Sequence, residues 1–479
     1  MSDSNKEIVM MRKVVPLGQK IAFGVGMLAN QMFPAALGIF MVVLVKDLGF
    51  PPLLWGIVFF LPRLFDAITD PIMGFISDNT KSRWGRRRQY VFIGAIILGV
   101  SFVLMWQLYT SNGLFYNFIY FVIFSFLFYL GLTIFSVPYV AMGYEMSSDY
   151  NERTRIMGVA QWIGQWAWVI APWFWVIIYR PDWFPSPESG SRQLAVWVGL
   201  ICMGLAMVPA IFVDSKSTKN AKDLKEINRK NLKKNFKYLI GNFKDAFKNK
   251  PFRKLCISTF LVFNTFNTIA AFSFFIIVFY LFDGDAGAAG LWPTLHGSVG
   301  ALCTTFIVIP IVTKISEKLG KKKTFILSQS ISIIGYILFW FVFVPGKPWL
   351  FLIALPFFSF GIGGLFTLMM SMTADVCDLD ELNSGSRREG IFGAIYWWMV
   401  KFGLAFAGLL SGIIMSLVNF SPGSLTQPEG AITGMRIFYS LLPIAGTLTA
   451  IAIMWTYDLT EKRSREIRAE LDKRNADDQ

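Results

Sequence analysis

Two aspartates four residues apart lie in a stretch of sequence that is otherwise apolar. Residues 59–74 read FFLPRLFDAITDPIMG, so Asp66 and Asp70 share one face of the helix that this segment predicts. A charge at the centre of a bilayer costs roughly 2.5–3.5 kcal/mol, and two ionised carboxylates this close repel each other unless a cation or a proton lies between them. We predict a binding site for Na⁺, Li⁺ or H⁺ at this pair. A structural ion pair of one acid with Arg63 is the alternative.

Two prolines free backbone oxygens that could add to such a site. Pro71 has no N–H to donate to the Ala67 carbonyl, and Pro138 likewise frees the Ile134 carbonyl, next to Thr133. Hard cations prefer oxygen ligands of this kind. Proline kinks without ligands are common in membrane helices, so this observation only supplements the acid pair.

Lys401 is a second isolated charge in an apolar segment, YWWMVKFG at 396–403. It needs a partner, and the aspartate pair is the candidate if the two segments meet in the fold. Such a lysine could compete with the cation and link cation binding to substrate binding. The alternative is that Lys401 extends its amine to the membrane interface.

Amides beside aromatic rings suggest a sugar site. Gln161 and Gln165 share a helix face, as do Trp162 and Trp166. Amides bond to hydroxyls, and flat rings cover the C–H face of a sugar. Further candidates at membrane depth are Asn30, Gln31, Asn264, Asn267, Tyr396 and Trp397. Lipid contact or an interfacial aromatic belt is the alternative for the tryptophans.

The elements that must position these residues are membrane helices. The mean hydropathy is +0.51, with 54% hydrophobic and 16% charged residues, which excludes an ordinary soluble domain. The apolar runs are long enough to cross about 30 Å of hydrocarbon as helices. We predict an all-α membrane protein without a signal peptide and with twelve spans, near 21–45, 52–77, 90–110, 114–144, 156–179, 193–213, 253–282, 289–313, 324–344, 349–374, 390–418 and 434–457.

The net charge of +14 reflects topology and not a nucleic-acid partner. Most of the 45 Lys and Arg residues fall in the N-terminal region, in alternate loops and in the C-terminal tail. This is the positive-inside pattern, and it predicts that both termini are cytoplasmic. The single histidine, the four scattered cysteines, and the absence of phosphate-loop and nucleophile-elbow motifs argue against an enzyme and against a bound cofactor.

The spans divide into two halves with a repeated motif. We predict an N-terminal half at 1–213, a Lys-rich linker at 214–252, a C-terminal half at 253–457 and a solvated, helical tail at 458–479. The linker pattern fits an amphipathic helix on the membrane surface or a solvated helix. Asp78 precedes Gly85-Arg86, and Glu317 precedes Gly320-Lys321, 235 residues later. Matching acid–glycine–base motifs in duplicated halves suggest a gate. Topological charge is the alternative.

These motifs resemble the glycoside–pentoside–hexuronide:cation symporter family of the major facilitator superfamily. The resemblance rests on DAITDPIMG at 66–74 with RWG at 83–85, on ADVCDLDE at 374–381, on Arg388-Glu389, and on KFG at 401–403. It covers the whole twelve-span layout. It implies a coupling-cation site at Asp66, Asp70 and Thr133 with Lys401 nearby, gate residues that include Arg83 and Arg388, and alternating access around a midplane sugar site.

The substrate region departs from the melibiose carrier, which typifies that family. Gln31 and Ser136 stand where that carrier has acids, and Val140 stands where it has a tryptophan. These losses argue against an α-galactoside and slightly favour an anionic hexuronide.

We expect a monomeric bacterial inner-membrane symporter that imports a sugar, glycoside or uronide with Na⁺ or H⁺. The neutral oxygen of Thr133 favours Na⁺. A lysolipid carrier of the same superfamily, an uncoupled sugar facilitator and a non-transporting receptor are the alternatives.

Overall fold

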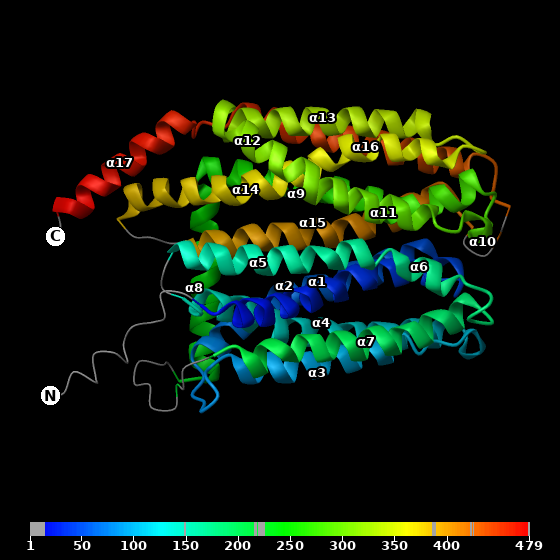
Figure 1. Cartoon of the computed structure of the whole chain (residues 1–479), viewed down its shortest axis with the longest axis horizontal. Helices are drawn as coiled ribbons and strands as arrows, with labels where there is room; N and C mark the ends of the chain where they lie inside the picture. Colours follow the sequence, from blue (N-terminus) through cyan, green and yellow to red (C-terminus); the bar gives the residue numbers. More distant parts are fainter. Residues whose placement is uncertain are drawn as a thin grey trace. The chain divides into compact units, whose positions relative to one another are not determined.

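Helices form all the regular structure that this computed structural model describes, which covers residues 15–147, 150–214, 218, 226–385, 389–421, 424 and 426–477. The first part of the chain contains α1 Leu17–Lys46, α2 Pro52–Asp78, α3 Arg88–Met105, the 3₁₀ turn η3 Thr110–Asn112, α4 Leu114–Glu145, α5 Tyr150–Ile170, α6 Trp173–Ile178, α7 Pro187–Phe212 and α8 Arg229–Lys248. Figure 1 shows these helices in colours from blue to green.

The second part has the same helical character with two π-helical segments. It contains α9 Lys250–Ile276, η4 Ile277–Leu281, α10 Ala286–Ala289, α11 Trp292–Leu302, η5 Cys303–Val308, α12 Ile309–Leu319, α13 Lys321–Val342, η6 Pro348–Ile353, α14 Leu355–Ser384, α15 Glu389–Leu417, α16 Ala431–Trp455 and α17 Glu461–Asp477. The π segments η4 and η5 continue α9 and α11 directly. π segments often occur at functional positions in helices.

Eleven helical stretches of the described residues are long and apolar enough to cross a membrane. They correspond to eleven of the twelve predicted spans. The remaining predicted span, 156–179, corresponds to α5 and α6, which are separated at Ala171-Pro172. Its polar residues explain why α5 does not reach the same apolarity, because charged residues begin the helix and Gln161 and Gln165 lie within it. The chain is therefore an all-α, multi-pass membrane protein.

The contacts divide the chain into two units. The first comprises 1–49 and 64–236, and the second comprises 50–63 and 237–479. The start of α2 belongs to the second unit because it packs on α15 without intervening side chains: a Cβ on Gly412 would overlap the Pro52 carbonyl oxygen. The predicted linker 214–252 extends across the division at residue 236, and α8 is its main element.

Both units use the same set of helix pairs. In the first unit α1 packs on α5 and α7, and α3 packs on α4 and α7. In the second unit α9 packs on α15 and α16, and α13 packs on α14 and α16. In order along each half, these are the same four pairings. Close packing relies on small residues, as where Gly99 of α3 faces Gly199 of α7. The duplicated halves that the repeated motif indicates therefore share an architecture.

The C-terminal helix differs from its expected state. The tail was predicted to be a solvated helix, but α17 packs against α14. Ile467 and Leu471 are only 0% and 2% exposed and belong to the core of the second unit. The i, i+4 spacing of these two apolar residues in a charged segment was the available sequence signal.

Candidate functional site

The predicted cation residues lie together in the first unit. Thr133 of α4 places its hydroxyl oxygen 2.6 Å from Asp66 Oδ1 and 3.1 Å from Asp70 Oδ1, both on α2. Thr133 and Asp66 are 1% and 3% exposed, and Asp70 is half-buried. The helical repeat puts the two carboxylates one turn apart on the same face of α2, and α4 supplies the hydroxyl between them.

A further hydroxyl, Thr69, completes this group of oxygens. Thr69 Oγ1 lies 3.0 Å from Thr133 Oγ1, 3.2 Å from the Asp66 carbonyl oxygen and 3.3 Å from the Phe65 carbonyl oxygen. Sequence reasoning did not include Thr69 among the site residues. Its position three residues after Asp66 and one before Asp70 was the signal that could have identified it.

One hydroxyl serves both carboxylates of this group. The Thr133 hydroxyl carries one hydrogen, and it lies within 3.1 Å of two carboxylate oxygens. A single hydrogen can be donated to one of these carboxylates at a time. Two carboxylates this close repel each other, and a proton or a metal cation between them relieves that repulsion. The cluster can therefore bind H⁺ or a small hard cation through oxygen ligands.

Arg63 contacts the helix turn that precedes it. Its Nη1 donates to the Phe59 carbonyl oxygen at 2.7 Å, its guanidinium carbon lies 3.5 Å from the centre of the Phe59 ring, and the residue is 6% exposed. These contacts hold the guanidinium against its own helix, and the pairing of Arg63 with one of the acids stays a prediction.

Lys401 is half-buried in α15, in the second unit. The next residue, Phe402, stacks on Trp398 at 5.5 Å between ring centres and contacts Phe260 of α9 at 5.6 Å. The acid pair belongs to the first unit, so the expectation that Lys401 approaches it stays a prediction.

Part of the predicted substrate site is assembled in the first unit. Gln31 of α1 donates from Nε2 to Gln161 Oε1 of α5 at 2.9 Å, and it accepts at Oε1 from the Trp168 indole N–H at 3.0 Å. Gly164 permits this contact, because a Cβ there would lie 2.8 Å from Gln31 Nε2. Trp168 was missed. It lies seven residues after Gln161, two helical turns along the same face, and this spacing could have indicated it.

The remaining candidates of the first unit lie near this group or beside it in sequence. Trp162 and Trp166 are 56% and 38% exposed and make an edge-to-face pair at 6.2 Å. Asn30 donates to Met27 Sδ at 3.8 Å, a weak contact. Gln165 is half-buried one turn after Gln161, and Ser136 is half-buried one turn after Thr133. The structure thus joins Gln31 with Gln161 directly, and the other side chains have separate contacts.

The predicted substrate residues of the second unit differ in their surroundings. Some pack within or between helices, and one is exposed. Asn264 donates to the Gly403 carbonyl oxygen at 3.3 Å, which joins α9 to α15, and Asn267 donates to the Phe263 carbonyl oxygen of its own helix at 2.7 Å. Tyr396 is fully buried, whereas Trp397 is 42% exposed. Asn264 and Tyr396 therefore have structural environments, and Trp397 is the accessible candidate of this group.

The gate motif of the first unit forms an ion-pair network. Arg87 Nη2 lies 2.7 Å from Asp78 Oδ1 and 3.1 Å from Glu145 Oε1 at the end of α4, and Arg86 pairs with the same Glu145. Arg87 is 7% exposed, and burial lowers the pKa of its guanidinium. Arg83 is exposed. Arg87 and Glu145 were missed, because α4 meets the loop only in the folded chain.

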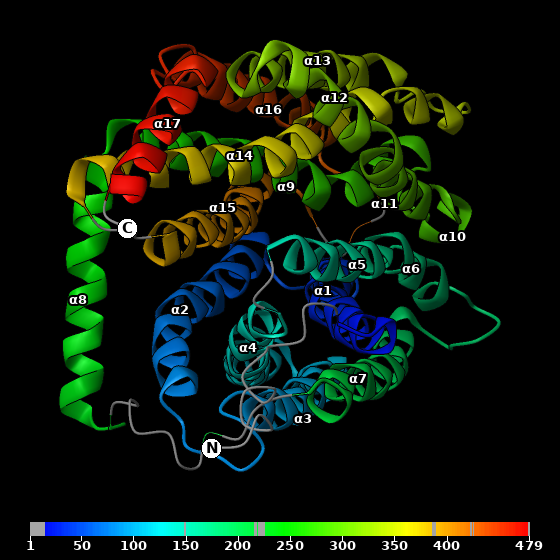
Figure 2. The ribbon, with the colours of Figure 1, turned by 60° about the vertical axis from the view of Figure 1, so that its left-hand side comes forward.

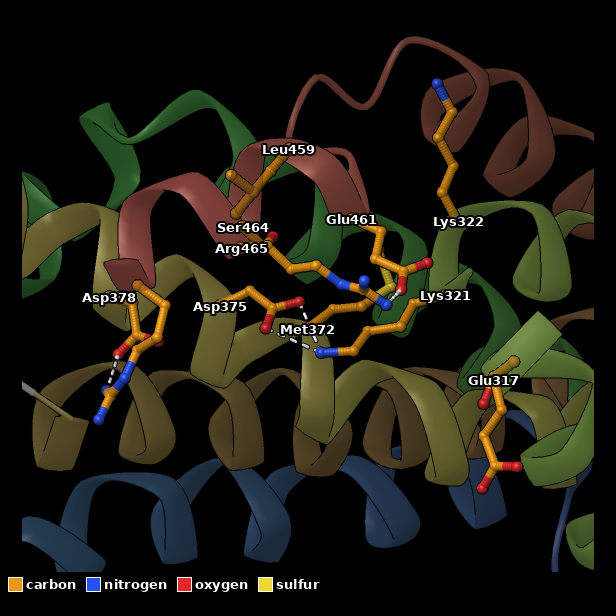
Figure 3. Close-up of a pocket in the computed structure, with 12 residues that line it drawn as sticks. Glu317, Lys321, Lys322, Met372, Asp375, Asp378, Leu459, Glu461, Ser464 and Arg465 are labelled. Atoms are coloured by element: carbon orange, nitrogen blue, oxygen red, sulfur yellow. Dashed lines mark hydrogen bonds and ion pairs between the residues drawn. The ribbon is translucent and has the colours of Figure 1, made fainter. Parts of the chain in front are cut away.

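The matching motif of the second unit also joins a base to an acid of the fourth helix of its half. Lys321 Nζ lies 2.7 Å from Asp375 Oδ2 of α14 (Figure 3). Glu317 and Lys321 help to line a pocket of about 480 Å³ between α14, α17 and the turn at Gly320. Arg388, which was also assigned to the gate, lies outside the described residues.

The basic residues after each glycine also cap the last membrane helix of their own half. Arg88 donates to the Ala210 and Ile211 carbonyl oxygens at the end of α7, at 2.5 and 2.7 Å. Lys322 donates to the Tyr457 carbonyl oxygen, two residues beyond α16, at 2.9 Å. Cations at helix C-termini satisfy free carbonyls and oppose the helix dipole. The two halves therefore repeat these hydrogen bonds to helix ends as well as the charged sequence motif.

Comparison with known proteins assigns the chain to a family. The family model described as "MFS/sugar transport protein" matches residues 22–461. The chain is 27% identical over 467 residues to a glucuronide carrier protein homolog of Escherichia coli K12, covering 95% of each chain. It is 25% identical over 428 residues to a putative glycoside/cation symporter of the same organism, covering 88% of this chain and 87% of the relative. A lactose permease of Leuconostoc lactis is 27% identical over 499 residues, covering 99% of this chain and 74% of the permease.

Solved structures show the same fold at low identity. The nucleoside transporter NupG has a TM-score of 0.61 with 16% identity, and the match covers 92% of this chain and 100% of that transporter. A bacterial homolog of the human lysosomal transporter Spinster has a TM-score of 0.63 with 14% identity and covers 97% and 99%. The matched family and the glucuronide carrier homolog are transporters, which confirms the expectation that the chain is not an enzyme. The chain belongs to the MFS/sugar transport family and is a symporter-like member of the major facilitator superfamily, similar to the glycoside–pentoside–hexuronide group.

Proposed function

We propose that this protein is a secondary active transporter that couples the inward flow of Na⁺ or H⁺ to the uptake of a sugar, glycoside or hexuronide. The observation that carries the proposal is the Asp66–Thr133–Asp70 cluster, in which two carboxylates share one hydroxyl at 2.6 and 3.1 Å. Relatives named as a glucuronide carrier homolog and a glycoside/cation symporter support the substrate class and the coupling.

The cluster would act by requiring a positive ligand. Without one, two carboxylates repel each other in a poorly solvated site. With a cation bound, that repulsion is relieved and α2 and α4 are held together through the Thr133 hydroxyl. Binding energy obtained this way can favour the conformation that binds sugar. Lys401 is our candidate for the group that links the two binding events.

The choice between Na⁺ and H⁺ depends on the neutral oxygens. Thr133 and Thr69 add hydroxyl oxygens to the carboxylates, and the Ala67 carbonyl lacks an N–H partner from Pro71. A proton needs only one carboxylate, whereas Na⁺ needs several oxygen ligands. This oxygen-rich environment therefore favours Na⁺, and no other cofactor is proposed.

The substrate group is proposed to include Gln31, Gln161 and Trp168. Their bonded amides and indole can exchange their mutual hydrogen bonds for bonds to sugar hydroxyls, and Trp162 and Trp166 offer ring faces. The absence of an acid at Gln31 and at Ser136 suits an anionic uronide better than it suits a cationic substrate.

The proposed setting is a bacterial inner membrane, with both termini cytoplasmic and the protein monomeric. The distribution of Lys and Arg among the loops supports the orientation. The loops with the Gly85 and Gly320 motifs would then both face the cytoplasm, where their ion pairs could close the inner side of the pathway.

The test is uptake of labelled glycosides and uronides into proteoliposomes with an imposed Na⁺ gradient, an H⁺ gradient, or neither. We expect accumulation with one gradient and none without it. Asp66→Asn and Asp70→Asn should abolish accumulation, while Asp182→Asn, a change of the same kind in an exposed loop, should not. Undiminished accumulation in both cluster variants would contradict the assignment. Equilibration without accumulation under either gradient would indicate an uncoupled facilitator.

A further inference from the structure

The helix α8 lies at the point where a membrane span begins. It ends at Lys248, and α9, whose span covers Lys250–Leu281, begins after the single residue Asn249. Asn249 accepts the Phe252 N–H and so starts the new helix directly. Within the second unit, the end of α8 runs across the direction of α9 and α15 in both views of the ribbon (Figures 1 and 2). This crossing at the start of a span is the arrangement expected of a helix that lies along the membrane surface.

One face of α8 is fixed to the first turns of two spans. Phe243 stacks on Phe247 at 4.8 Å and meets the Trp398 ring of α15 edge-on at 5.4 Å. Phe247 contacts Phe252, the third residue of α9, at 6.3 Å, and Ala246 is 1% exposed. Trp398 lies about two turns inside the apolar segment that begins at Ile391. These contacts attach the end of α8 to the beginning of α9 and to α15, two of the helices that are long and apolar enough to cross a membrane.

The opposite face of α8 carries a stripe of lysines. At 100° per residue, six exposed lysines fall within an arc of about 100°, namely Lys230, Lys233, Lys234, Lys237, Lys244 and Lys248. Lys248 has a side-chain exposure of 79%, and its ion pair with Asp245 at 2.7 Å involves the sole acidic residue of the helix. We call these six residues the lysine face.

We propose that the lysine face binds the headgroups of anionic phospholipids in the leaflet from which α9 starts. Three observations carry this: the strong excess of positive charge, the attachment of the opposite face to the first turns of α9 and α15, and the one-residue connection to α9. A basic stripe held at headgroup depth meets the negative lipid surface within a Debye length, where attraction is effective. Each lysine in that position raises partitioning to anionic lipid about five-fold. This inference does not depend on the proposed substrate or cation.

Gly241 offers a place for a probe. It is exposed, lies within the arc of the lysine face, and has no atom within 4 Å of a Cβ built on it. The cysteines of the chain are all buried. The Gly241→Cys full-length protein would be labelled with a fluorophore and placed in nanodiscs of phosphatidylcholine with phosphatidylglycerol, in which one of the two lipids carries a nitroxide quencher near the glycerol. The unsubstituted protein, labelled in parallel, corrects for any reaction at the buried thiols.

We expect labelled phosphatidylglycerol to quench at least about three-fold more than labelled phosphatidylcholine at equal mole fraction. Lys233→Gln, Lys234→Gln and Lys237→Gln together should reduce that ratio to near one. Lys314→Gln, Lys318→Gln and Lys473→Gln make the same charge change at exposed positions of α12 and α17 and should leave the ratio unchanged.

Three outcomes would overturn the proposal. These are equal quenching by the two lipids, quenching by neither, and a ratio that the α8 substitutions do not alter. Quenching by neither lipid would indicate that the lysine face serves the aqueous phase or a soluble acidic partner. If the glutamine variant fails to reconstitute, the ratio measured with all lysines intact at high salt (about 0.5 M NaCl) decides, because screening at that ionic strength should abolish the preference.

Discussion

Replacement of Thr133 by valine tests the cation cluster most directly. Valine keeps the shape of the side chain and removes only the hydroxyl that lies 2.6 Å from Asp66 and 3.1 Å from Asp70. A hydrogen bond to a charged group contributes about 1.5–3 kcal/mol, and about 1.4 kcal/mol corresponds to a factor of ten in affinity. The variant should therefore change the apparent cation affinity about 10-fold to 100-fold.

Which dependence changes, that on Na⁺ or that on pH, identifies the ion. If the protein couples to Na⁺, the hydroxyl oxygen is a lost ligand, and half-maximal uptake needs about 10-fold to 100-fold more Na⁺. If it couples to H⁺, the loss of the hydroxyl changes the dependence of uptake on pH, and the Na⁺ concentration has no effect in either protein. The assay is initial uptake in proteoliposomes as Na⁺ concentration and pH are varied independently.

Two variants provide the controls. Thr133→Ser retains the hydroxyl and should stay within a few-fold of the parent protein. Thr69→Val removes a hydroxyl whose described contacts are Thr133 and the carbonyl oxygens of Phe65 and Asp66, so a change of about 2-fold to 10-fold is expected for neutral hydrogen bonds. Equal cation dependence in the valine and serine variants of Thr133 would refute the assignment of its hydroxyl to the site.

Three further variants address other parts of the structure. Trp168→Phe removes the indole donor to Gln31 and should raise the KM for sugar about 2-fold to 10-fold in uptake assays, without changing cation dependence. Gly320→Ala should lower the free energy of unfolding by about 1–3 kcal/mol in thermal denaturation, since Gly320 has φ 78° and ψ 158°. The pKa of Glu152 is lowered by hydrogen bonds from Lys20 and from the backbone, so this carboxylate stabilises the fold above its usual pKa and loses that contribution as pH falls. Glu152→Gln should therefore lower thermal stability at pH 7, and the difference from the parent protein should shrink as the pH falls below the usual pKa of a glutamate.

The proximity of Asp66 to Asp70 was predictable because their geometry is local. A spacing of four residues on one helix fixes the relation of Asp66 to Asp70 whatever the rest of the chain does. Thr133 lies on another helix, and only the family resemblance connected it to the pair. Thr69 was overlooked because hydroxyls are frequent in membrane helices and bond to their own backbone, as Thr69 also does.

The gate partners were not predictable from the local pattern. Asp78, Gly85 and Gly320 identified the loops, but Glu145 and Asp375 lie in other helices, 59 and 54 residues along the chain from the bases that they bind. Their contacts depend on the register between packed helices, which close glycine contacts set within a fraction of a turn. Trp168 differs from these partners, because its spacing from Gln161 was visible in the sequence and only its contact with Gln31 of α1 needed the fold.

The two units share their packing and their gate contacts but not their acid pair. At the 235-residue offset that relates Gly85 to Gly320, the positions of Asp66 and Asp70 correspond to Ala301 and Thr305. The second unit therefore lacks carboxylates at the matching places.

This asymmetry constrains any coupling mechanism. A ligand shifts a conformational equilibrium only through different affinities for the two states. Suppose that one half alone forms the cation site and that the site does not change when the halves rearrange. Such a site would bind the cation with equal affinity in both states, and cation binding could not shift the equilibrium between them. A group whose interaction with the cluster differs between the two states would supply such a difference, and a lysine ammonium has the chemistry to compete with a bound cation. Lys401 is the candidate for that group, and its role stays a prediction.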